Sequence, residues 1–334
     1  MGEFELLQRI RQRLPQPDPR VRLDSGDDAA ISAPGGATAT SVDALIDGVH
    51  FRREWSSLPQ TGAKALAVAL SDLAAMGAET GEAYVVLGVP PDLDEEGCIE
   101  LLDGMARMAA ETGTTLAGGD VTRAPALTLA VTVVGHAESA DDFVTRAGAQ
   151  PGDVLAVTGE LGGAAAGLLL LEGAGSSRSS FHPHSGRNDD RERLLIARQL
   201  EPRARLEAGR ALAAGGATAM IDLSDGLGGD AGHLATASGV GLLIDAAALP
   251  IAAGVAEVAA AAGRDPIEPA TSGGEDYELL AALPPELLAA ATAALARQGE
   301  AGLTRIGEAI AGGGVEIRLP DGGLLEPRGF DQLG

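Results

Sequence analysis

The chain has 334 residues and a formal net charge of −24 at pH 7, and 45% of its residues are hydrophobic and 22% are charged. These values are typical of a globular protein with an apolar core, and the length allows two domains of ordinary size. An acidic surface repels nucleic acids and anionic membranes, so we expect neither as a partner. A phosphorylated ligand would need metal ions or local arginines to offset this charge.

The single cysteine and the lack of long apolar runs exclude further classes of protein. Cys98 is the single cysteine, which excludes a disulfide within the chain and a zinc site of the usual Cys and His spacing. The sequence has no apolar leader and no run of about 18 apolar residues, so we expect a cytoplasmic protein without a membrane span. Lys64 is the only lysine among 24 basic residues, and whether it has a role stays open.

The first half of the chain predicts alternating helices and strands. Apolar periodicity predicts helices at 3–14, 61–77 and 93–112 and strands at 38–46, 83–89, 114–117 and 126–135. Within the helix at 61–77, Leu66, Leu70 and Leu73 form an apolar stripe, and Asp72 lies off that stripe. Turn residues follow at 148–153, and we place a domain boundary at 138–152.

The second half predicts strands at 154–158, 218–223 and 241–245. It predicts helices at 162–172, 191–214, 226–238 and 284–298. The stretch 173–190 is rich in Ser, Gly, His and Arg and poor in apolar residues, so we expect it to be mobile. The mixed order of elements predicts an α/β (α+β) protein of two domains, at 1–140 and 150–334.

Aspartates beside glycines or other small residues recur in six short segments, which are 26–30 (GDDAA), 41–43 (SVD), 71–77 (SDLAAMG), 118–120 (GGD), 222–226 (DLSDG) and 273–276 (GGED). Carboxylates are hard oxygen ligands of the kind Mg²⁺ takes, and glycine lets the backbone approach a bulky anion. Together they predict a site where metal ions neutralise phosphates. No Gly-x-x-x-x-Gly-Lys-[Ser/Thr] loop is present, so a P-loop enzyme is excluded.

Each of these residues also has an ordinary structural interpretation. Asp225 stands between a strand and a helix, where it would serve as an N-cap, and 25–28 would make a simple turn. Asp72 fits a surface acid on an amphipathic helix. Arg146 suits a bidentate phosphate contact or an exposed surface position. His50 is either a substrate contact or base, or a partly buried structural histidine.

The order and wording of the segments resemble the thiamine-monophosphate kinase family, in the superfamily of aminoimidazole ribonucleotide synthetase. The resemblance covers nearly the whole chain. It rests above all on 64–78 (KALAVALSDLAAMGA) and 272–279 (SGGEDYEL), with further matches at 26–30, 43–51, 118–123 (GGDVTR), 145–157, 221–227 (IDLSDGL) and 329–331.

The resemblance implies an activity and an architecture. The activity is phosphorylation of thiamine monophosphate to thiamine diphosphate, with ATP as co-substrate and several Mg²⁺ ions, by direct in-line transfer. The implied protein is a homodimer built on a β-rich N-terminal domain that binds ATP and metal. A C-terminal α/β domain would complete the nucleotide and substrate site.

The resemblance also implies roles for individual residues, none of them a covalent carrier or a general base. The implied metal ligands are Asp28, Ser41, Asp43, Asp72, Asp120, Asp222 and Asp225. The implied ATP-binding residues are Gly119, Asp120, Arg146 and Ser224, and the implied substrate contacts are His50, Glu275 and Phe330. The chain departs from the family pattern at Val42, where threonine is common, and at Ala69, where asparagine is common.

Two other functions remain open on the sequence. One is a different ATP-dependent enzyme of the same superfamily that acts on another small substrate. The superfamily's selenide and hydrogenase-maturation enzymes need a cysteine near one end of the chain, whereas Cys98 lies mid-chain in a predicted helix. The other function is a non-catalytic acidic metal-binding scaffold, which would not bind nucleotide in an Mg²⁺-dependent way.

Overall fold

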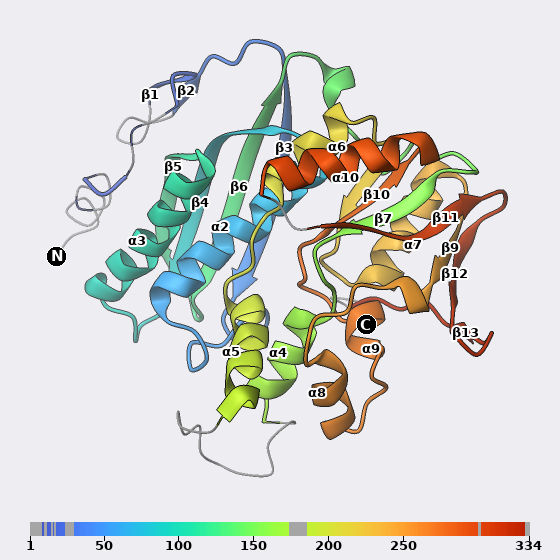
Figure 1. Cartoon of the computed structure of the whole chain (residues 1–334). Coiled ribbons are helices and arrows are strands. Elements are labelled where there is room, and N and C mark those ends of the chain that lie inside the picture. The colour runs from blue at the N-terminus through green and yellow to red at the C-terminus, as the bar shows by residue number, and fades with distance from the viewer. Residues whose placement is uncertain are drawn as a thin grey trace. The chain divides into compact units, whose positions relative to one another are not determined.

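The computed structural model describes residues 9, 12–14, 16, 18–23, 30–173, 186–299 and 302–330. Contacts between residues divide the chain into two units (Figure 1). The first unit comprises Met1–Leu73 and Ala78–Phe143, and the second comprises Ala74–Gly77 and Val144–Gly334. None of the described helices combines the length and the hydropathy needed to cross a bilayer.

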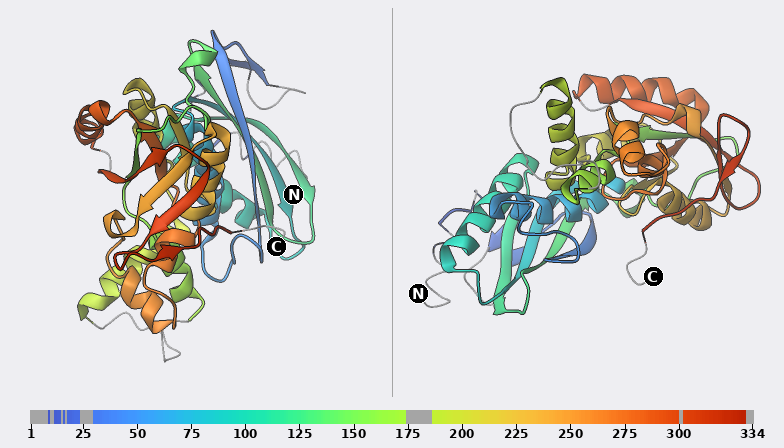
Figure 2. Two further views of the ribbon diagram at one scale, coloured as in Figure 1. Left: turned by 90° about the vertical axis from the view of Figure 1, so that its right-hand side faces the viewer. Right: turned by 90° about the horizontal axis from the view of Figure 1, so that it is seen from below.

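The first unit is built on a four-stranded sheet. Its strands lie in the order β3 (Ala37–Ile46), β6 (Thr128–Ala137), β4 (Glu79–Val89) and β5 (Thr115–Arg123), with only the β4–β5 pair parallel. Helices α2 (Leu58–Ala75) and α3 (Glu95–Thr112) lie on the same face of this sheet (Figure 2). The short strands β1 (Val21–Leu23) and β2 (Ile31–Ser32) pair separately.

Apolar periodicity and a glycine explain how α2 and α3 pack. Leu66, Leu70 and Leu73 are fully buried, as their stripe predicts. The two helices approach each other closely, because a Cβ on Gly104 of α3 would lie 1.9 Å from the carbonyl oxygen of Pro59. Helix α3 begins at the N-cap Asp94, whose carboxylate accepts from the Gly97 amide at 2.9 Å.

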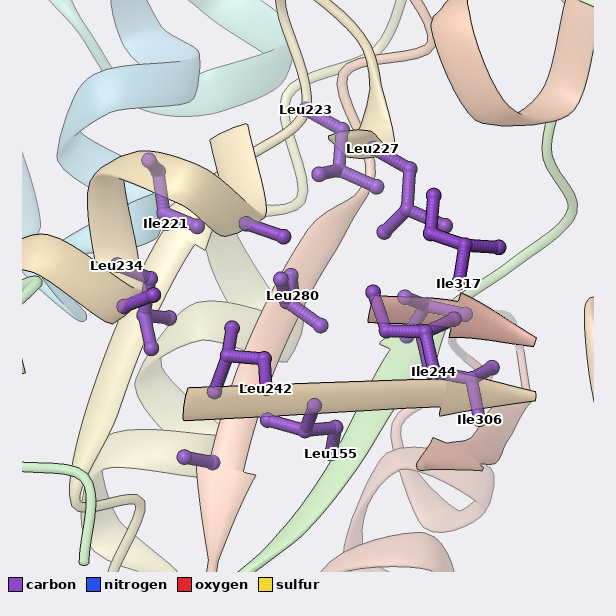
Figure 3. Packing of buried hydrophobic residues seen from close by; sticks show 14 of the residues in the cluster. Leu155, Ile221, Leu223, Leu227, Leu234, Leu242, Ile244, Leu280, Ile306 and Ile317 are labelled. Atoms are coloured by element: carbon purple, nitrogen blue, oxygen red, sulfur yellow. The ribbon is translucent and has the colours of Figure 1, made fainter. Parts of the chain in front are cut away.

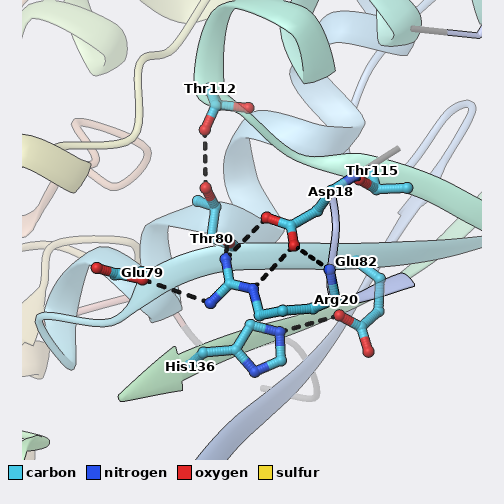
Figure 4. Close-up of polar contacts among 8 residues, drawn as sticks. All are labelled: Asp18, Arg20, Glu79, Thr80, Glu82, Thr112, Thr115 and His136. Carbon is cyan, nitrogen blue, oxygen red and sulfur yellow. Dashed lines mark hydrogen bonds and ion pairs between the residues drawn. The ribbon is translucent and has the colours of Figure 1, made fainter. Parts of the chain in front are cut away.

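A partly buried polar network anchors residues 18–20 to the sheet (Figure 4). The Arg20 guanidinium donates to both carboxylate oxygens of Asp18, each at 2.9 Å, and to the Thr80 carbonyl at 3.0 Å. The Arg20 hydrogen bond holds the pKa of Asp18 below its usual value. Beside this pair, His136 and Glu82 lie 3.0 Å apart and are both buried. Strand β1 is therefore fixed at the start of β4.

The second unit contains a seven-stranded sheet and most of the helices. Its strand order is β13-β12-β9-β11-β7-β10-β8, and only β9 and β12 are paired in parallel. The strands are β7 (Val154–Thr158), β8 (Ala219–Asp222), β9 (Gly241–Asp245), β10 (Leu279–Leu283), β11 (Leu303–Ile310), β12 (Gly314–Arg318) and β13 (Leu324–Leu325). The helices are α4 (Gly163–Leu171), α5 (Gly186–Leu200), α6 (Leu206–Ala214), α7 (Leu227–Ser238), α8 (Val255–Ala261), α9 (Glu268–Ser272) and α10 (Leu288–Arg297).

Aliphatic side chains form the core of the second unit (Figure 3). Leu155, Leu242 and Leu280 come from three different strands of the sheet, and Leu234 comes from α7. All four are fully buried. A core of leucine, isoleucine, valine and alanine agrees with the aromatic content of only 2%.

Several predicted elements need correction. The predicted helix at 191–214 is two helices, α5 and α6, interrupted at 201–205, where Pro202 cannot donate a helical hydrogen bond. The strand predicted at 114–117 continues through the Gly-Gly-Asp segment to Arg123. Residues 186–190, expected to be mobile, begin α5, whereas 174–185 and most of the predicted helix at 3–14 lie outside the described residues.

Candidate active site

Backbone hydrogen bonds join two of the aspartate segments in the second unit. The Glu275 amide donates to the Ser224 carbonyl at 2.8 Å, and the Tyr277 amide donates to the Leu223 carbonyl at 2.9 Å. The Leu223 amide in turn donates to the Glu278 carbonyl at 2.8 Å. Segments 222–226 and 273–278 therefore run side by side, where β8 ends and just before β10 begins.

The C-terminal part of the chain joins the same place. The Phe330 amide donates to the Asp225 carbonyl at 2.9 Å. The chain here crosses the first turn of α7, where a Cβ on Gly228 would lie 2.6 Å from the backbone of Arg328. The Phe330 ring stays 60% exposed. The structure thus brings Ser224, Asp225, Glu275 and Phe330 together.

Arg146 is held elsewhere in the second unit. Its carbonyl accepts from the Ser238 hydroxyl at 2.9 Å, at the last residue of α7. The N-cap Gly226 lies at the other end of this helix, about 18 Å away at the usual helical rise. The described contacts therefore do not bring the Arg146 backbone to Ser224.

The prediction that Asp225 caps α7 is wrong. The N-cap is Gly226, which has a φ of 111° and no side chain to donate or accept. The Asp230 carboxylate takes this role from inside the helix, accepting from the amides of Asp225 and Gly226 at 3.1 and 3.0 Å. Burial, followed by the nearby charges of Asp222 and Asp225, raises the pKa of Asp230 to about 8.

Glu278 is a site-shaping residue that sequence reasoning missed. Its buried carboxylate accepts from the Thr158 hydroxyl at 2.6 Å and from the Arg205 guanidinium at 2.8 and 2.6 Å. A buried carboxylate requires such partners. The sequence signal that could have identified Glu278 is its apolar neighbours Tyr277 and Leu279, because apolar residues on both sides of an acid indicate that the acid lies at the start of a buried strand.

In the first unit, a strand and a helix bring two predicted metal ligands together. Ser41 and Asp43 share one face of β3, the face on which Ala39 and Leu45 are buried. The Ser41 hydroxyl donates to an Asp72 carboxylate oxygen from α2. Asp72 is half-buried and bonded, so its interpretation as a plain surface acid is wrong.

One of the two departures from the family pattern lies away from this face. Val42 points to the opposite side of β3, where it is 66% exposed, so a hydroxyl there would not join Ser41 and Asp43. Ala69 is fully buried within α2. Lys64 is buried in the same helix rather than exposed on the surface.

Asp120 lies at the far side of the same sheet. Across the sheet, Asp43 of β3 is aligned with Val131 of β6, Val85 of β4 and Gly119 of β5. Asp120 is one position further along β5, so its side chain faces the other side of the sheet. Three strand spacings separate β3 from β5, which is about 14 Å. The structure therefore does not bring Asp120 to Asp43. Gly119 is required by packing, because a Cβ there would lie 2.0 Å from the Val85 carbonyl oxygen.

His50 follows β3 and is oriented by the strand. Its Nδ1 accepts from the Ile46 amide at 3.1 Å, which assigns the proton of the neutral ring to Nε2. His50 is half-buried. The ring therefore offers an N–H donor to a ligand, which favours a binding contact over a general base.

The donor chemistry of both units suits a hard divalent cation. The first unit offers the Ser41–Asp72 pair with Asp43 on the same strand face, and the second offers Asp222 and Asp225, whose charges help to raise the pKa of the nearby Asp230. Over the described parts of the chain, no three carboxylate, histidine or cysteine side chains gather closely enough to form a ready metal site. Asp28 lies outside the described residues.

Comparison with known proteins adds independent findings. The AIR synthase related protein family matches the chain with its N-terminal domain at 26–137 and its C-terminal domain at 150–320. The thiamine-monophosphate kinase of Mycobacterium tuberculosis is 39% identical over 84% of the chain and 80% of that protein. The crystal structure of thiamine-monophosphate kinase from Stenotrophomonas maltophilia has a TM-score of 0.82 and 34% identity, covering 97% of this chain and 98% of that one. AaThiL complexed with AMPPCP and TMP has a TM-score of 0.75 and 33% identity, covering 87% and 86%.

Proposed function

Since the chain belongs to the thiamine-monophosphate kinase family, among the AIR synthase related proteins, we propose that it transfers the γ-phosphoryl group of ATP to thiamine monophosphate. The products are thiamine diphosphate and ADP. The observation that carries the proposal is the meeting of segments 222–226 and 273–278 with Phe330 in the second unit, because these segments also carry the resemblance.

The chemistry requires positioning rather than a base. The acceptor is a phosphate monoester whose second pKa is about 6, so its attacking oxygen is already ionised near neutral pH. In-line transfer then needs two anions to be aligned and their charge to be offset. This requirement agrees with the His50 ring, whose Nδ1 already accepts a hydrogen bond from the Ile46 amide.

We propose Mg²⁺ as the cation, held by Ser41, Asp43, Asp72 and Asp120 of the first unit, by Asp222 and Asp225 of the second, and by Asp28. Bound Mg²⁺ would neutralise charge between the phosphates of the two substrates. The hydrogen bond from Ser41 to Asp72 supports the assignment, since it already places two oxygen donors side by side. The net charge of −24 makes such neutralisation necessary for a doubly anionic reaction.

We propose separate contacts for the two substrates. Gly119, Asp120, Arg146 and Ser224 would contact ATP, while His50, Glu275 and Phe330 would contact thiamine monophosphate. The Glu275 carboxylate complements the cationic thiazolium ring, and the exposed Phe330 ring can stack on an aromatic ring of the substrate. In this proposal the domain at 1–140 supplies ATP and metal contacts, and the domain at 150–334 supplies the remaining nucleotide and substrate contacts.

We also propose a cytoplasmic homodimer formed through the first unit. The sheet face opposite α2 and α3 is uncharged at its middle. Two sets of residues aligned across β3, β6 and β4 form this part of the face, namely Val42, Thr132 and Tyr84 and next to them Ala44, Ala130 and Val86. Val42 and Val86 are 66% and 42% exposed. In a chain of net charge −24, such a face suits a second copy of itself. With the two sheets packed face to face, β5 of one copy would lie over β3 of the other, which would bring a second chain's Asp120 to the strand that carries Asp43.

Asp72 provides the sharpest test of the metal assignment. We expect Asp72→Asn to lower turnover by on the order of 100-fold, since an amide is a poor ligand for Mg²⁺. Circular dichroism should show an unchanged fold. Asp103→Asn, on the exposed side of α3, is the matched control and should keep its turnover. Near-normal turnover of Asp72→Asn with an unchanged Mg²⁺ requirement would exclude the ligand role.

A further inference from the structure

The loop that carries Glu275 has an unusual backbone. Among the described residues, Glu275 and Tyr277 are the two non-glycine residues with positive φ, at 68° and 50°. Residues other than glycine rarely adopt this left-handed backbone conformation, and it persists only where the surrounding structure imposes it. These two residues flank Asp276. Their conformation indicates that interactions with the surrounding structure hold the loop in one shape.

Asp276 supplies one of the constraints. Its carboxylate turns inward and accepts from the amides of Gly162 and Ala164, at 2.6 and 3.2 Å, at the first turn of α4. Backbone bonds on either side, from Glu275 to Ser224 and from Tyr277 to Leu223, hold the loop at two more points.

Gln199 supplies the other constraint. This buried residue of α5, which is 5% exposed, donates through its side-chain amide to a carboxylate oxygen of Glu275. The donor is uncharged, so this hydrogen bond orients the carboxylate without neutralising it. Helices α4 and α5 are packed backbone to backbone, since a Cβ on Gly167 would lie 2.2 Å from the Leu195 carbonyl oxygen. One rigid helix pair therefore holds both Asp276 and Glu275.

We propose that Gln199 and Asp276 are positioning residues for Glu275 and thereby determine how well the enzyme recognises the thiamine part of its acceptor. The inference rests on the proposed function and extends it to two residues to which that proposal gives no contact with ATP or metal. Asp276 fixes the backbone from which Glu275 projects, and Gln199 fixes the direction of its carboxylate. A misdirected carboxylate loses contact with a cationic ring while the ATP contacts stay intact.

The test compares Michaelis constants for the two substrates. We expect Gln199→Ala to raise the KM for thiamine monophosphate by about tenfold or more and to change the KM for ATP by less than about twofold. Asp276→Asn should show the same split, together with a lower melting temperature. Gln298→Ala, at the exposed end of α10, is the matched control and should leave both constants unchanged.

Each outcome has a separate meaning. Wild-type constants in Gln199→Ala, or an equal rise in both constants, would overturn the positioning role, because general damage to the fold does not select one substrate. Gln199→Ala decides the matter even where Asp276→Asn fails to fold. If the wild-type protein forms no thiamine diphosphate, the proposed function itself fails, and the recognition role falls with it.

Discussion

The three carboxylates of the SGGEDYEL segment, Glu275, Asp276 and Glu278, have different environments and therefore different tasks. Asp276 turns inward to the backbone amides of α4, and Glu278 is paired with Arg205 and Thr158. Neither residue is arranged to meet a ligand. A segment that is specific as a family signature thus combines one residue proposed for binding, Glu275, with two that hold the loop in shape.

The environment of Asp276 predicts a dependence of stability on pH. Burial raises the pKa of Asp276 from its usual 3.8 to about 7, against the opposing effect of the two amide hydrogen bonds. The folded state therefore binds more protons than the unfolded state between these values, and the contribution of Asp276 to stability is lost as pH rises towards 7.

Urea denaturation of the wild-type protein and of Asp276→Asn at pH 5, 6, 7 and 8 would measure this contribution. We expect the difference in unfolding free energy between the two proteins to change through this window and to level off above pH 7, with the wild type losing stability relative to the variant. A difference that is constant from pH 5 to pH 8 would contradict the raised pKa.

Candidate site residues were easier to name from the sequence than the contacts that each one makes. Residue type and spacing indicated Asp43 and Asp72, because carboxylates beside small residues are recognisable in a sequence, whereas the role of Glu275 was implied by the family resemblance, and all three roles stay predictions. The partner of Asp72 could not be read in this way, since Ser41 comes from a strand 31 positions earlier. Asp225 was misjudged as a cap because capping depends on the φ of Gly226 and on Asp230, which follows five residues later.

At the scale of elements, apolar periodicity predicted the helices that face a core. Helices α2 and α3 and strands β3, β4 and β6 lie where their patterns indicate. The strands β10, β11 and β12 were missed because continuous or mixed apolar runs do not distinguish strand from helix. The break between α5 and α6 was predictable from the sequence, because Pro202 cannot donate a helical hydrogen bond.

Close packing of α2 against α3 predicts the effect of adding a single methyl group. We expect Gly104→Ala to destabilise the protein by about 1–3 kcal/mol, because the new Cβ would collide with the Pro59 carbonyl. The control is Gly232→Ala in α7, where nothing lies within 4 Å and alanine should stabilise by roughly 0.5–1 kcal/mol. Unfolding free energies from urea titration would compare them, and a neutral Gly104→Ala would refute the close approach.

At the scale of the whole molecule, the placement of Asp43 and Asp120 on opposite edges of one sheet leads to a complementation test. Under the proposed dimer, each site takes Asp43 from one copy and Asp120 from the other. Asp43→Asn and Asp120→Asn should each be nearly inactive alone. Co-expressed with different tags, they should recover roughly a quarter of wild-type turnover, because half of the dimers are mixed and one of their two sites is intact.

The result would distinguish two arrangements of the site. Activity that returns only in the purified mixed dimer supports a site shared between copies. A mixed dimer as inactive as its parents would show that Asp43 and Asp120 do not serve one site from different chains. A protein that elutes as a monomer at assay concentration, with full turnover, would contradict the proposed homodimer.

The central claim, phosphorylation of thiamine monophosphate, is tested most directly by its products. The purified protein would be incubated with ATP, Mg²⁺ and thiamine monophosphate, and the nucleotides and thiamine phosphates separated by chromatography. We expect one thiamine diphosphate for each ADP formed, and no product once a chelator removes Mg²⁺. ADP without thiamine diphosphate would move the protein to another substrate of the same superfamily, and the absence of both products would contradict the kinase activity.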